Sequence, residues 1–249
     1  MNSIRQQLIQ EYIEKNHVAT IRELHALCPD VSVMTIHRDL DALEQRGFLV
    51  KVRGGARSVR HSGDIGFDIR LQENIEGKLV IAQKALSLIQ PHATIFLDAS
   101  TTNLILARKL PEIPLNIFTT GPNIAVELCR LPDANITVCC GTLNRKNMAL
   151  SGANTQQMLE KINIDMAFIG VSGCFADAGF TCGTEADMMV KRTAIRRART
   201  NVMMCDSTKF SRLMPYTFAG FDDVQYLISD DHVPEHICQT AKAHGVVIL

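Results

Sequence analysis

The chain has 249 residues, 46% of them hydrophobic and 21% charged, a composition that indicates a folded protein and excludes a disordered one. Its 26 basic and 26 acidic residues balance to a net charge of zero, so any surface that attracts nucleic acid must be local. No stretch reaches the roughly 18 apolar residues of a membrane span, and the N-terminus lacks the apolar segment of a signal peptide. We therefore expect a cytoplasmic protein of two unequal domains, with no membrane partner.

Eight cysteines are scattered along the chain, without a CxxC pair or a Cys/His cluster at metal-ligand spacing. We expect them to be reduced residues of the core. His232 and His236 are four residues apart, but Pro234 between them marks a helix start, so they need not share a face. Glycine-rich nucleotide-binding motifs are also missing from the sequence. The sequence therefore predicts neither a metal nor a cofactor.

Two short helices are predicted at the start of the chain. The first follows Ser3, an N-cap candidate, and continues to about Asn16. The second is capped by Thr20 and stops before Pro29. Each helix carries an apolar stripe that needs a partner, formed in the first by Ile4, Leu8, Ile9, Tyr12 and Ile13 and in the second by Ile21, Leu24 and Leu27.

A third helix is predicted from the N-cap candidate Ser32 to Gly47. Its apolar stripe comprises Val33, Ile36, Leu40 and Leu43. The opposite face carries Met34, Thr35, Arg38, Asp41 and Gln45, with His37 at its flank. Because Arg, Thr and His donate hydrogen bonds to base edges and phosphate oxygens, such a face fits a major groove. We predict DNA contacts from Ser32, Met34, Thr35, His37 and Arg38.

A β-hairpin is predicted next, with strands at 48–52 and 56–59 joined by Gly54 and Gly55. Five basic residues and no acidic one lie between positions 45 and 60. We predict that Lys51, Arg53 and Arg57 contact the phosphate backbone. Residues 1–57 thus form a winged helix-turn-helix. A single polar helix would favour a solvated interaction domain instead, but here three helices, a hairpin and local positive charge coincide.

The segment VSVMTIHRDLDALEQRGFLVKVRGGA, from Val31 to Ala56, resembles the signature of the DeoR family of bacterial transcriptional regulators. The matching positions are Thr35, Ile36, Arg38, Asp39, Leu40, Leu43, Glu44, Gly47, Gly54, Gly55 and Ala56. His37 stands where the family commonly has a second Arg, which bears on base preference. The resemblance implies a double-stranded DNA operator. Paired half-sites, which such regulators commonly bind, imply a homodimer or homotetramer.

Residues 58–72 are predicted to be a linker and residues 73–249 a separate α/β domain. A long helix is expected from Glu73 to Ile89, with an inward face of Leu79, Ala82, Leu86 and Ile89. Short apolar runs then alternate with helical stretches, which predicts a mostly parallel, Rossmann-like sheet with crossover helices. The expected strands are 95–97, 115–118, 136–139, 166–169, 202–204, 225–228 and 246–249.

Polar or glycine-bearing loops follow five of these strands. The carboxyl ends of parallel strands open on one edge, so these loops should converge on a ligand site. Ser100, Thr101 and Thr102 precede a helix, whose N-terminus favours a phosphate or carboxylate. Each loop alone is typical of ordinary capping and turn residues, but five together favour a ligand site, which a small phosphorylated polyol would suit. The candidate ligand-binding residues are Asp98, Ser100, Thr101, Thr102, Thr120, Gly141, Arg145, Gly170, Lys191, Asp206 and Lys209.

Asp98 is expected to accept hydrogen bonds from sugar hydroxyls, and Lys191, Lys209 and Arg145 to neutralise the phosphate. The segments LDASTTNLILARKL, FTTGPNIAVEL, DMAFIGVSG, GTEADMMVKR and DSTKF resemble effector-domain motifs of the same family. That domain resembles ribose-phosphate isomerase and senses phosphorylated sugars. The resemblance thus implies a phosphorylated sugar effector and, since most members repress, a repressor of sugar-metabolism genes. Ser100 replaces a Gly that many members carry.

The alternative is a sugar-phosphate isomerase-like enzyme with a DNA-binding head. Isomerisation needs a carboxylate base beside the substrate, and those isomerases carry an Asp-Gly-Ala-Asp-Glu run. Residues 169–173 at the similar place here contain no carboxylate, although Asp98, Glu185 or Asp206 could still act as a base. We therefore predict a sensor and not an enzyme. A non-specific DNA-packaging protein would not need so large a second domain.

Overall fold

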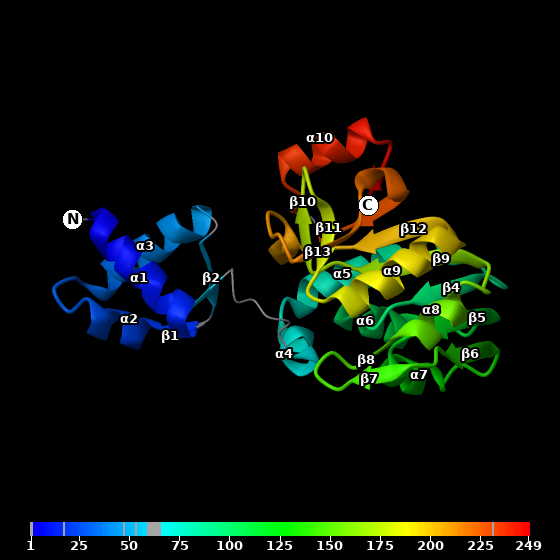
Figure 1. The fold of residues 1–249 in the computed structure, drawn as a ribbon. Helices are drawn as coiled ribbons and strands as arrows, with labels where there is room; N and C mark the ends of the chain where they lie inside the picture. Colours follow the sequence, from blue (N-terminus) through cyan, green and yellow to red (C-terminus); the bar gives the residue numbers. More distant parts are fainter. Residues whose placement is uncertain (1, 17, 47, 53, 59–65, 231) are drawn as a thin grey trace. The chain divides into compact units, whose positions relative to one another are not determined.

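The computed structural model describes the chain except residues 1, 17, 47, 53, 59–65 and 231. The chain divides into two compact units, residues 1–63 and 64–249 (Figure 1). The predicted linker, residues 58–72, contributes its last part to the second unit, because Phe67–Gln72 form helix α4 and Phe67 is buried there.

The first unit has three helices and a small antiparallel sheet among its described residues. Strand β3 lies in the middle of this sheet, in the order β1-β3-β2. The elements are α1 (Asn2–Asn16), β1 (Val18–Thr20), α2 (Ile21–Leu27), α3 (Val33–Gln45), β2 (Leu49–Val52) and β3 (Gly55–Ser58). The predicted helices and hairpin are confirmed. Strand β1 was not predicted, because it is only three residues long and pairs with a strand far along the chain.

Local capping explains where α2 and α3 begin. The hydroxyl of Thr20 accepts the N–H of Glu23, and the Glu23 carboxylate accepts the N–H of Thr20, forming a capping box. Ser32 accepts the N–H of Thr35 at 3.3 Å and so caps α3. Both caps were predicted from the sequence.

Three apolar residues of the predicted stripes are exposed rather than buried. Ile4 is 74% exposed and Leu8 41%, because α1 turns Ile9, Ile13 and, in part, Tyr12 toward the core formed with α3 and β3. Val33 is exposed in the first turn of α3, whereas Ile36, Leu40 and Leu43 are buried as predicted. Gly47, the predicted end of α3, lies outside the described residues.

The second unit is built on a seven-stranded sheet in which every adjacent pair is parallel. Its order is β15-β14-β12-β9-β4-β5-β6. The strands are β4 (Thr94–Leu97), β5 (Leu115–Thr119), β6 (Ala134–Val138), β9 (Ile164–Gly170), β12 (Ala198–Met204), β14 (Tyr226–Ile228) and β15 (Val247–Ile248). All seven predicted strands are present, and the predicted parallel α/β class is confirmed.

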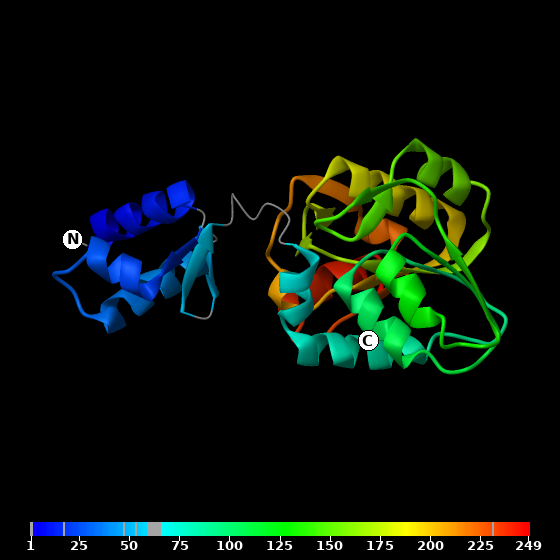
Figure 2. The ribbon, with the colours of Figure 1, turned by 90° about the horizontal axis from the view of Figure 1, so that it is seen from below.

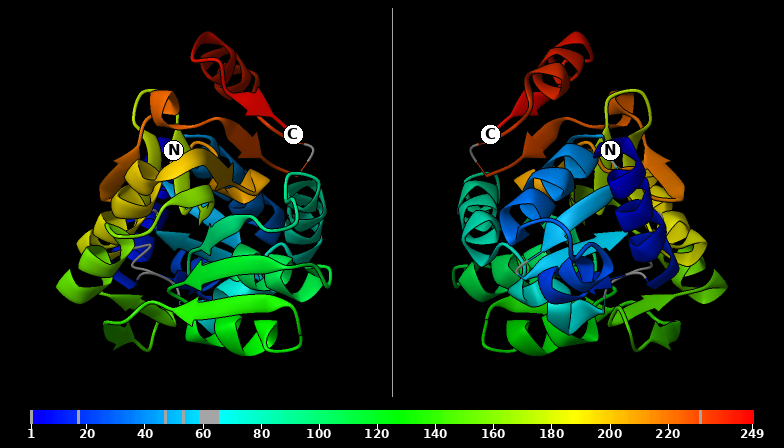
Figure 3. Two further views of the ribbon diagram at one scale, coloured as in Figure 1. Left: turned by 90° about the vertical axis from the view of Figure 1, so that its right-hand side faces the viewer. Right: turned by 90° about the vertical axis from the view of Figure 1, so that its left-hand side faces the viewer.

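Helices cover both faces of this sheet, as the view from below and the two side views show (Figure 2 and Figure 3). One hydrophobic core receives side chains of α4, α5 (Ile75–Leu86), α6 (Thr101–Lys109) and α7 (Pro122–Leu128). The other core receives those of α8 (Ala153–Leu159), α9 (Glu185–Arg197) and α10 (Glu235–Ala243). In α5 the prediction for Leu79 was wrong, because Leu79 is exposed while Ile81, Ala82 and Ala85 face the core.

The second unit also contains several short elements where the sequence predicts only loops. They form a second antiparallel sheet, a hairpin and two 3-10 turns: β10 (Gly173–Phe175), β11 (Gly179–Cys182), β13 (Tyr216–Ala219), β7 (Thr142–Asn144), β8 (Ala149–Ser151), η1 (Ser207–Lys209) and η2 (Phe221–Asp223). Such short strands show no readable periodicity. The cysteine prediction also needs correction, because Cys129 and Cys140 are exposed, although all eight thiols are free. None of the described helices has the length and apolarity to cross a membrane.

Candidate functional site: a helix face for DNA and a polar cleft

The exposed face of α3 carries the side chains that were predicted to contact DNA. Met34 is 63% exposed, Arg38 is exposed, and Thr35 and His37 are half-buried. The hydroxyl of Ser32 is 3.1 Å from that of Thr35, so both lie at the N-terminal end of the helix. Arg38 has no hydrogen bond or ion pair with the described part of the chain, which leaves its five N–H donors for a ligand.

Asp39, the acidic residue of the motif, has a structural role. It is buried on α3, and its carboxylate accepts hydrogen bonds from Arg5 at 2.5 and 3.2 Å and from Gln6 at 3.0 Å. The ion pair with Asp39 raises the pKa of Arg5, chiefly through the side-chain hydrogen bond. Asp39 thus fixes α1 against the helix that presents Arg38.

The wing is described only in part. Lys51 on β2 forms an ion pair with Asp41 of α3, and its backbone N–H donates to Glu44 at 2.7 Å. Asp41 is exposed and Lys51 is partly exposed, so this ion pair contributes little to stability. Arg53 and the side chain of Arg57 lie outside the described residues.

In the second unit, a cleft opens where the carboxyl ends of β4, β5, β9 and β12 meet. Nine of the eleven predicted ligand residues line it: Asp98, Ser100, Thr101, Thr102, Thr120, Gly170, Lys191, Asp206 and Lys209. Gly141 and Arg145 do not line it. Arg145 is exposed in the β7–β8 connection, and a Cβ at Gly141 would lie 2.2 Å from Thr155 Oγ1. Gly141 therefore permits a close approach of chain segments.

Asp98 is fully occupied by donors of the protein itself, contrary to the expectation that it would meet sugar hydroxyls. Its Oδ1 accepts the N–H of Ser100 at 3.0 Å and Nδ2 of Asn103 at 2.8 Å. Its Oδ2 accepts the N–H of Gly170 at 2.9 Å and Nζ of Lys191 at 2.6 Å. Asp98 therefore positions two cleft loops and a buried lysine.

Lys191, which lies on α9, forms the ion pair with Asp98. Its Nζ also donates to the carbonyl of Gly170 at 2.7 Å and lies 3.6 Å from Asp187. Burial alone would lower the pKa of Lys191, but the carboxylates of Asp187 and Asp98 outweigh burial and raise it. Lys191 therefore stays charged, and its positive charge is largely balanced by these neighbours.

The N-terminus of α6 points into the cleft. Ser100 caps this helix by accepting the N–H of Asn103 at 3.1 Å, and Thr101 and Thr102 are buried in its first turn. A Cβ at Gly170 would lie 2.3 Å from Cβ of Ser100, so glycine lets β9 end against this loop. Backbone N–H groups and hydroxyls at a helix N-terminus form a site that favours a phosphate group.

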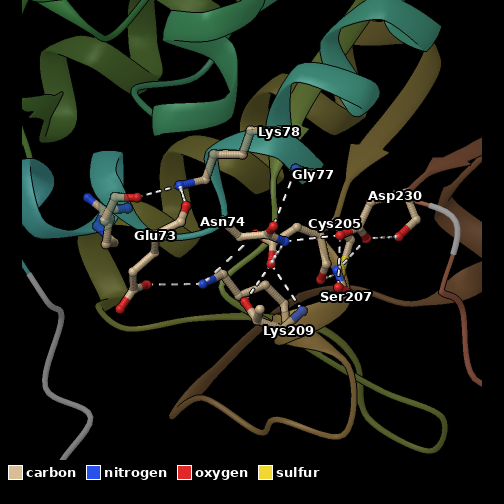
Figure 4. A network of polar contacts seen from close by, with 12 residues as sticks. Glu73, Asn74, Gly77, Lys78, Cys205, Ser207, Lys209 and Asp230 are labelled. Carbon is tan, nitrogen blue, oxygen red and sulfur yellow. Dashed lines mark hydrogen bonds and ion pairs between the residues drawn. The ribbon is translucent and has the colours of Figure 1, made fainter. Parts of the chain in front are cut away.

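A basic end of the cleft was missed by the sequence analysis. Arg70, Lys78 and Arg212 line the cleft together with Lys209. Lys78 on α5 is only 2% exposed, and its Nζ donates to the carbonyls of Arg70 and Glu73, the latter at 2.5 Å (Figure 4). Burial, followed by the charge of Lys209, lowers the pKa of Lys78 to about 8. Arg70 was missed because its segment was read as linker, and Lys78 because a helical lysine is usually solvated.

Asp206 also serves the fold of the cleft. It caps η1 by accepting the N–H of Thr208 at 3.0 Å and that residue's hydroxyl, and it accepts Nδ2 of Asn74 at 3.4 Å. The same amide donates to Asp230 at 3.0 Å (Figure 4). Burial alone would raise the pKa of Asp230, but hydrogen bonds from Asn74 and Ser207 outweigh it and lower that pKa. No cluster of three metal-ligating side chains occurs among the residues that the structure describes.

Comparison with known proteins covers both units. Residues 5–62 match the DeoR-like helix-turn-helix domain, and residues 73–231 match the DeoR C terminal sensor domain. The HTH-type transcriptional regulator GolR of Listeria innocua is 31% identical over 246 residues, which cover 98% of this chain and 96% of that protein. The L-fucose operon activator of Haemophilus influenzae is 28% identical over 247 residues, 98% of each protein. Ribose 5-phosphate isomerase A of Methanocaldococcus jannaschii is a structural neighbour with 15% identity, a TM-score of 0.40 and 54% coverage of each chain.

Proposed function

Because the chain belongs to the DeoR family of transcriptional regulators, we propose that it represses sugar-metabolism genes and that a phosphorylated sugar in its second unit controls its binding to operator DNA. The observation that carries this proposal is the cleft, which combines the N-terminus of α6 with buried lysines. A helix N-terminus and ammonium groups both favour a phosphate group. The remaining polar side chains of the cleft suit hydroxyl groups of a sugar.

The first unit binds DNA through α3, with Arg38 reading a base edge and Lys51, Arg53 and Arg57 contacting phosphates. Support comes from the exposure of Arg38 and from Asp39, which fixes the helix on α1. Two copies of the helix are needed for paired half-sites, so we propose that the protein binds DNA as a homodimer or homotetramer.

Replacing Arg38 by Ala should weaken binding to the operator by about 1–3 kcal/mol and should reduce the preference for it over random DNA. The physical reason is that a guanidinium group makes bidentate hydrogen bonds to guanine that alanine cannot make. Fluorescence anisotropy with the two DNAs measures both effects, and Arg199→Ala, at an exposed position of the second unit, is the matched control. Equal losses on both DNAs would show that Arg38 does not read bases.

A panel of sugar phosphates should identify the effector through thermal unfolding. A ligand that binds only the folded chain stabilises it by RT ln(1 + [L]/Kd), about 2.7 kcal/mol at a concentration of 100 Kd. The unphosphorylated sugars serve as matched controls and should give little or no shift. If no phosphorylated sugar shifts the transition, the cleft does not bind this class of ligand and the proposal is wrong.

The isomerase alternative is less well supported by the cleft. Asp98 and Asp206, two of its candidate bases, already accept hydrogen bonds from the protein, and residues 169–173 bring no carboxylate. Turnover of a sugar phosphate that binds would nevertheless establish an enzyme. The sign of regulation is a separate question, because one relative is named an activator. A reporter fused to the operator decides it: deletion of this gene should raise expression if the protein is a repressor.

A further inference from the structure

Glu73 holds both lysines of the basic end of the cleft, through two different groups. Its carboxylate Oε2 lies 3.5 Å from Nζ of Lys209, and its backbone carbonyl accepts Nζ of Lys78 at 2.5 Å (Figure 4). Glu73 and both lysines line the cleft. The carboxylate thus lies beside the cations that an incoming phosphate group would meet.

The ion pair between Glu73 and Lys209 is loose. Charge-assisted N–H···O bonds are commonly about 2.7–2.9 Å long, whereas this separation is 3.5 Å. The side chain of Glu73 is 28% exposed, so its carboxylate is in contact with solvent. Asp206 is 3.9 Å from the same ammonium group, but it is engaged in capping η1. Glu73 is therefore the replaceable carboxylate of the two.

The charges at this end of the cleft favour a dianion over a single carboxylate. Burial first, and the neighbouring ammonium group of Lys209 second, lower the pKa of Lys78 to about 8. The two lysines therefore repel each other, and a group with more negative charge than Glu73 relieves more of that repulsion. Arg70 and Arg212 also line the cleft.

Glu73 is also the residue at which α4 ends. Its backbone N–H donates to the carbonyl of Arg70 at 3.3 Å, and Nζ of Lys78 bonds the carbonyls of both residues. The ammonium group of Lys78 thus caps the C-terminal turn of α4, where a cation is favoured. A movement of Glu73 therefore acts directly on this turn. At the N-terminal end of α4, the N–H of Phe67 donates to the carbonyl of Lys146 at 2.8 Å.

We propose that Glu73 is a built-in competitor of the effector: its carboxylate pairs with Lys209, and a phosphate monoester that enters the cleft takes its place. This inference rests on the proposed function, because it assumes that the effector carries a phosphate group. Displacement of Glu73 frees the C-terminal turn of α4 to rearrange. The conformation of α4 then depends on whether the cleft is occupied.

Calorimetric titration of the full chain with inorganic phosphate tests the competition. Glu73→Gln should bind phosphate about three- to tenfold more tightly than wild type, because glutamine has nearly the shape of glutamate but no negative charge to compete for Lys209. Lys209→Gln should bind it about tenfold more weakly. Glu112→Gln and Lys109→Gln, at exposed positions away from the cleft, are the matched controls and should match wild type.

Amide hydrogen exchange of residues 67–72 tests the link to α4. Phosphate should change exchange there in wild type, and Glu73→Gln should show the same change without phosphate. If phosphate or a sugar phosphate binds wild type and Glu73→Gln binds no more tightly, the competitor role is refuted while the proposed function stands. If wild type and Glu73→Gln bind neither phosphate nor any sugar phosphate, the proposed function fails and this inference fails with it.

Discussion

Replacing Asp98 by Asn is expected to lower the free energy of unfolding of the second unit by about 3–5 kcal/mol. Both carboxylate oxygens accept two hydrogen bonds, from Ser100 and Asn103 on one side and from Gly170 and Lys191 on the other. An asparagine side chain has one oxygen and one NH₂ group. In either orientation the NH₂ group would face two hydrogen-bond donors of the protein, from which it cannot accept. The buried ammonium group of Lys191 also loses its nearest counter-charge. Urea unfolding monitored by circular dichroism measures the loss.

Two variants make this test specific. Glu127→Gln removes a carboxylate from the exposed ion pair with Arg108 and should cost no more than about 1 kcal/mol. Adding Lys191→Met to Asp98→Asn removes the unpaired charge and should recover part of the loss. A cost below about 1 kcal/mol for Asp98→Asn itself would mean that Asp98 does not hold the two loops together.

Replacing Gly55 by Ala should disrupt the first unit, at a cost of about 3 kcal/mol. A Cβ at Gly55 would lie 2.1 Å from the carbonyl oxygen of Ala19 and 2.9 Å from Cα of Thr20. Both contacts are with backbone atoms of β1, which pairs with β3 here, so no side chain can move aside. We expect a loss of affinity for every DNA sequence, since the support of α3 is affected rather than one base contact. Fluorescence anisotropy with operator and random DNA measures it.

Gly54→Ala is the matched control for this prediction. Gly54 has a φ of +84° but open space around its Cβ, so alanine there meets backbone strain without a steric clash. The expected cost is about 1–2 kcal/mol, with DNA binding retained. If Gly55→Ala is as mild as Gly54→Ala, the close approach of β1 and β3 does not support the DNA-binding unit.

The sequence predicts those features that depend on neighbouring residues. Thr20 and Ser32 indicate helix starts, because capping acts over three residues. Apolar runs such as Ile95 to Leu97 indicate buried strands. β1 was missed because Val18 to Thr20 carries almost no pattern by itself. Its partner is β3, across two helices, and only the tertiary fold shows that pairing.

The roles of charged residues in the cleft were harder to predict. Asp98 was correctly placed at the edge of the sheet. Two of its four donors, Gly170 and Lys191, come from distant parts of the chain, so the sequence could not show that both carboxylate oxygens already have partners. Lys78 lies on helix α5. The apolar periodicity of this helix predicts that Ala82 is buried, but it does not predict the burial of a lysine. Its burial depends on two carbonyl groups at the end of α4, those of Arg70, in the predicted linker, and of Glu73, the first residue after it.

We propose that a ligand in the cleft controls DNA binding. The most direct test of this control is the affinity of the full chain for DNA from upstream of the genes adjoining its own, measured with and without the sugar phosphate that stabilises the chain. We predict that the ligand changes affinity for this DNA about 5- to 150-fold, the usual range of coupling between two sites, and leaves affinity for random DNA nearly unchanged. A sugar phosphate that binds in the cleft while the affinity for this DNA stays the same would contradict the account.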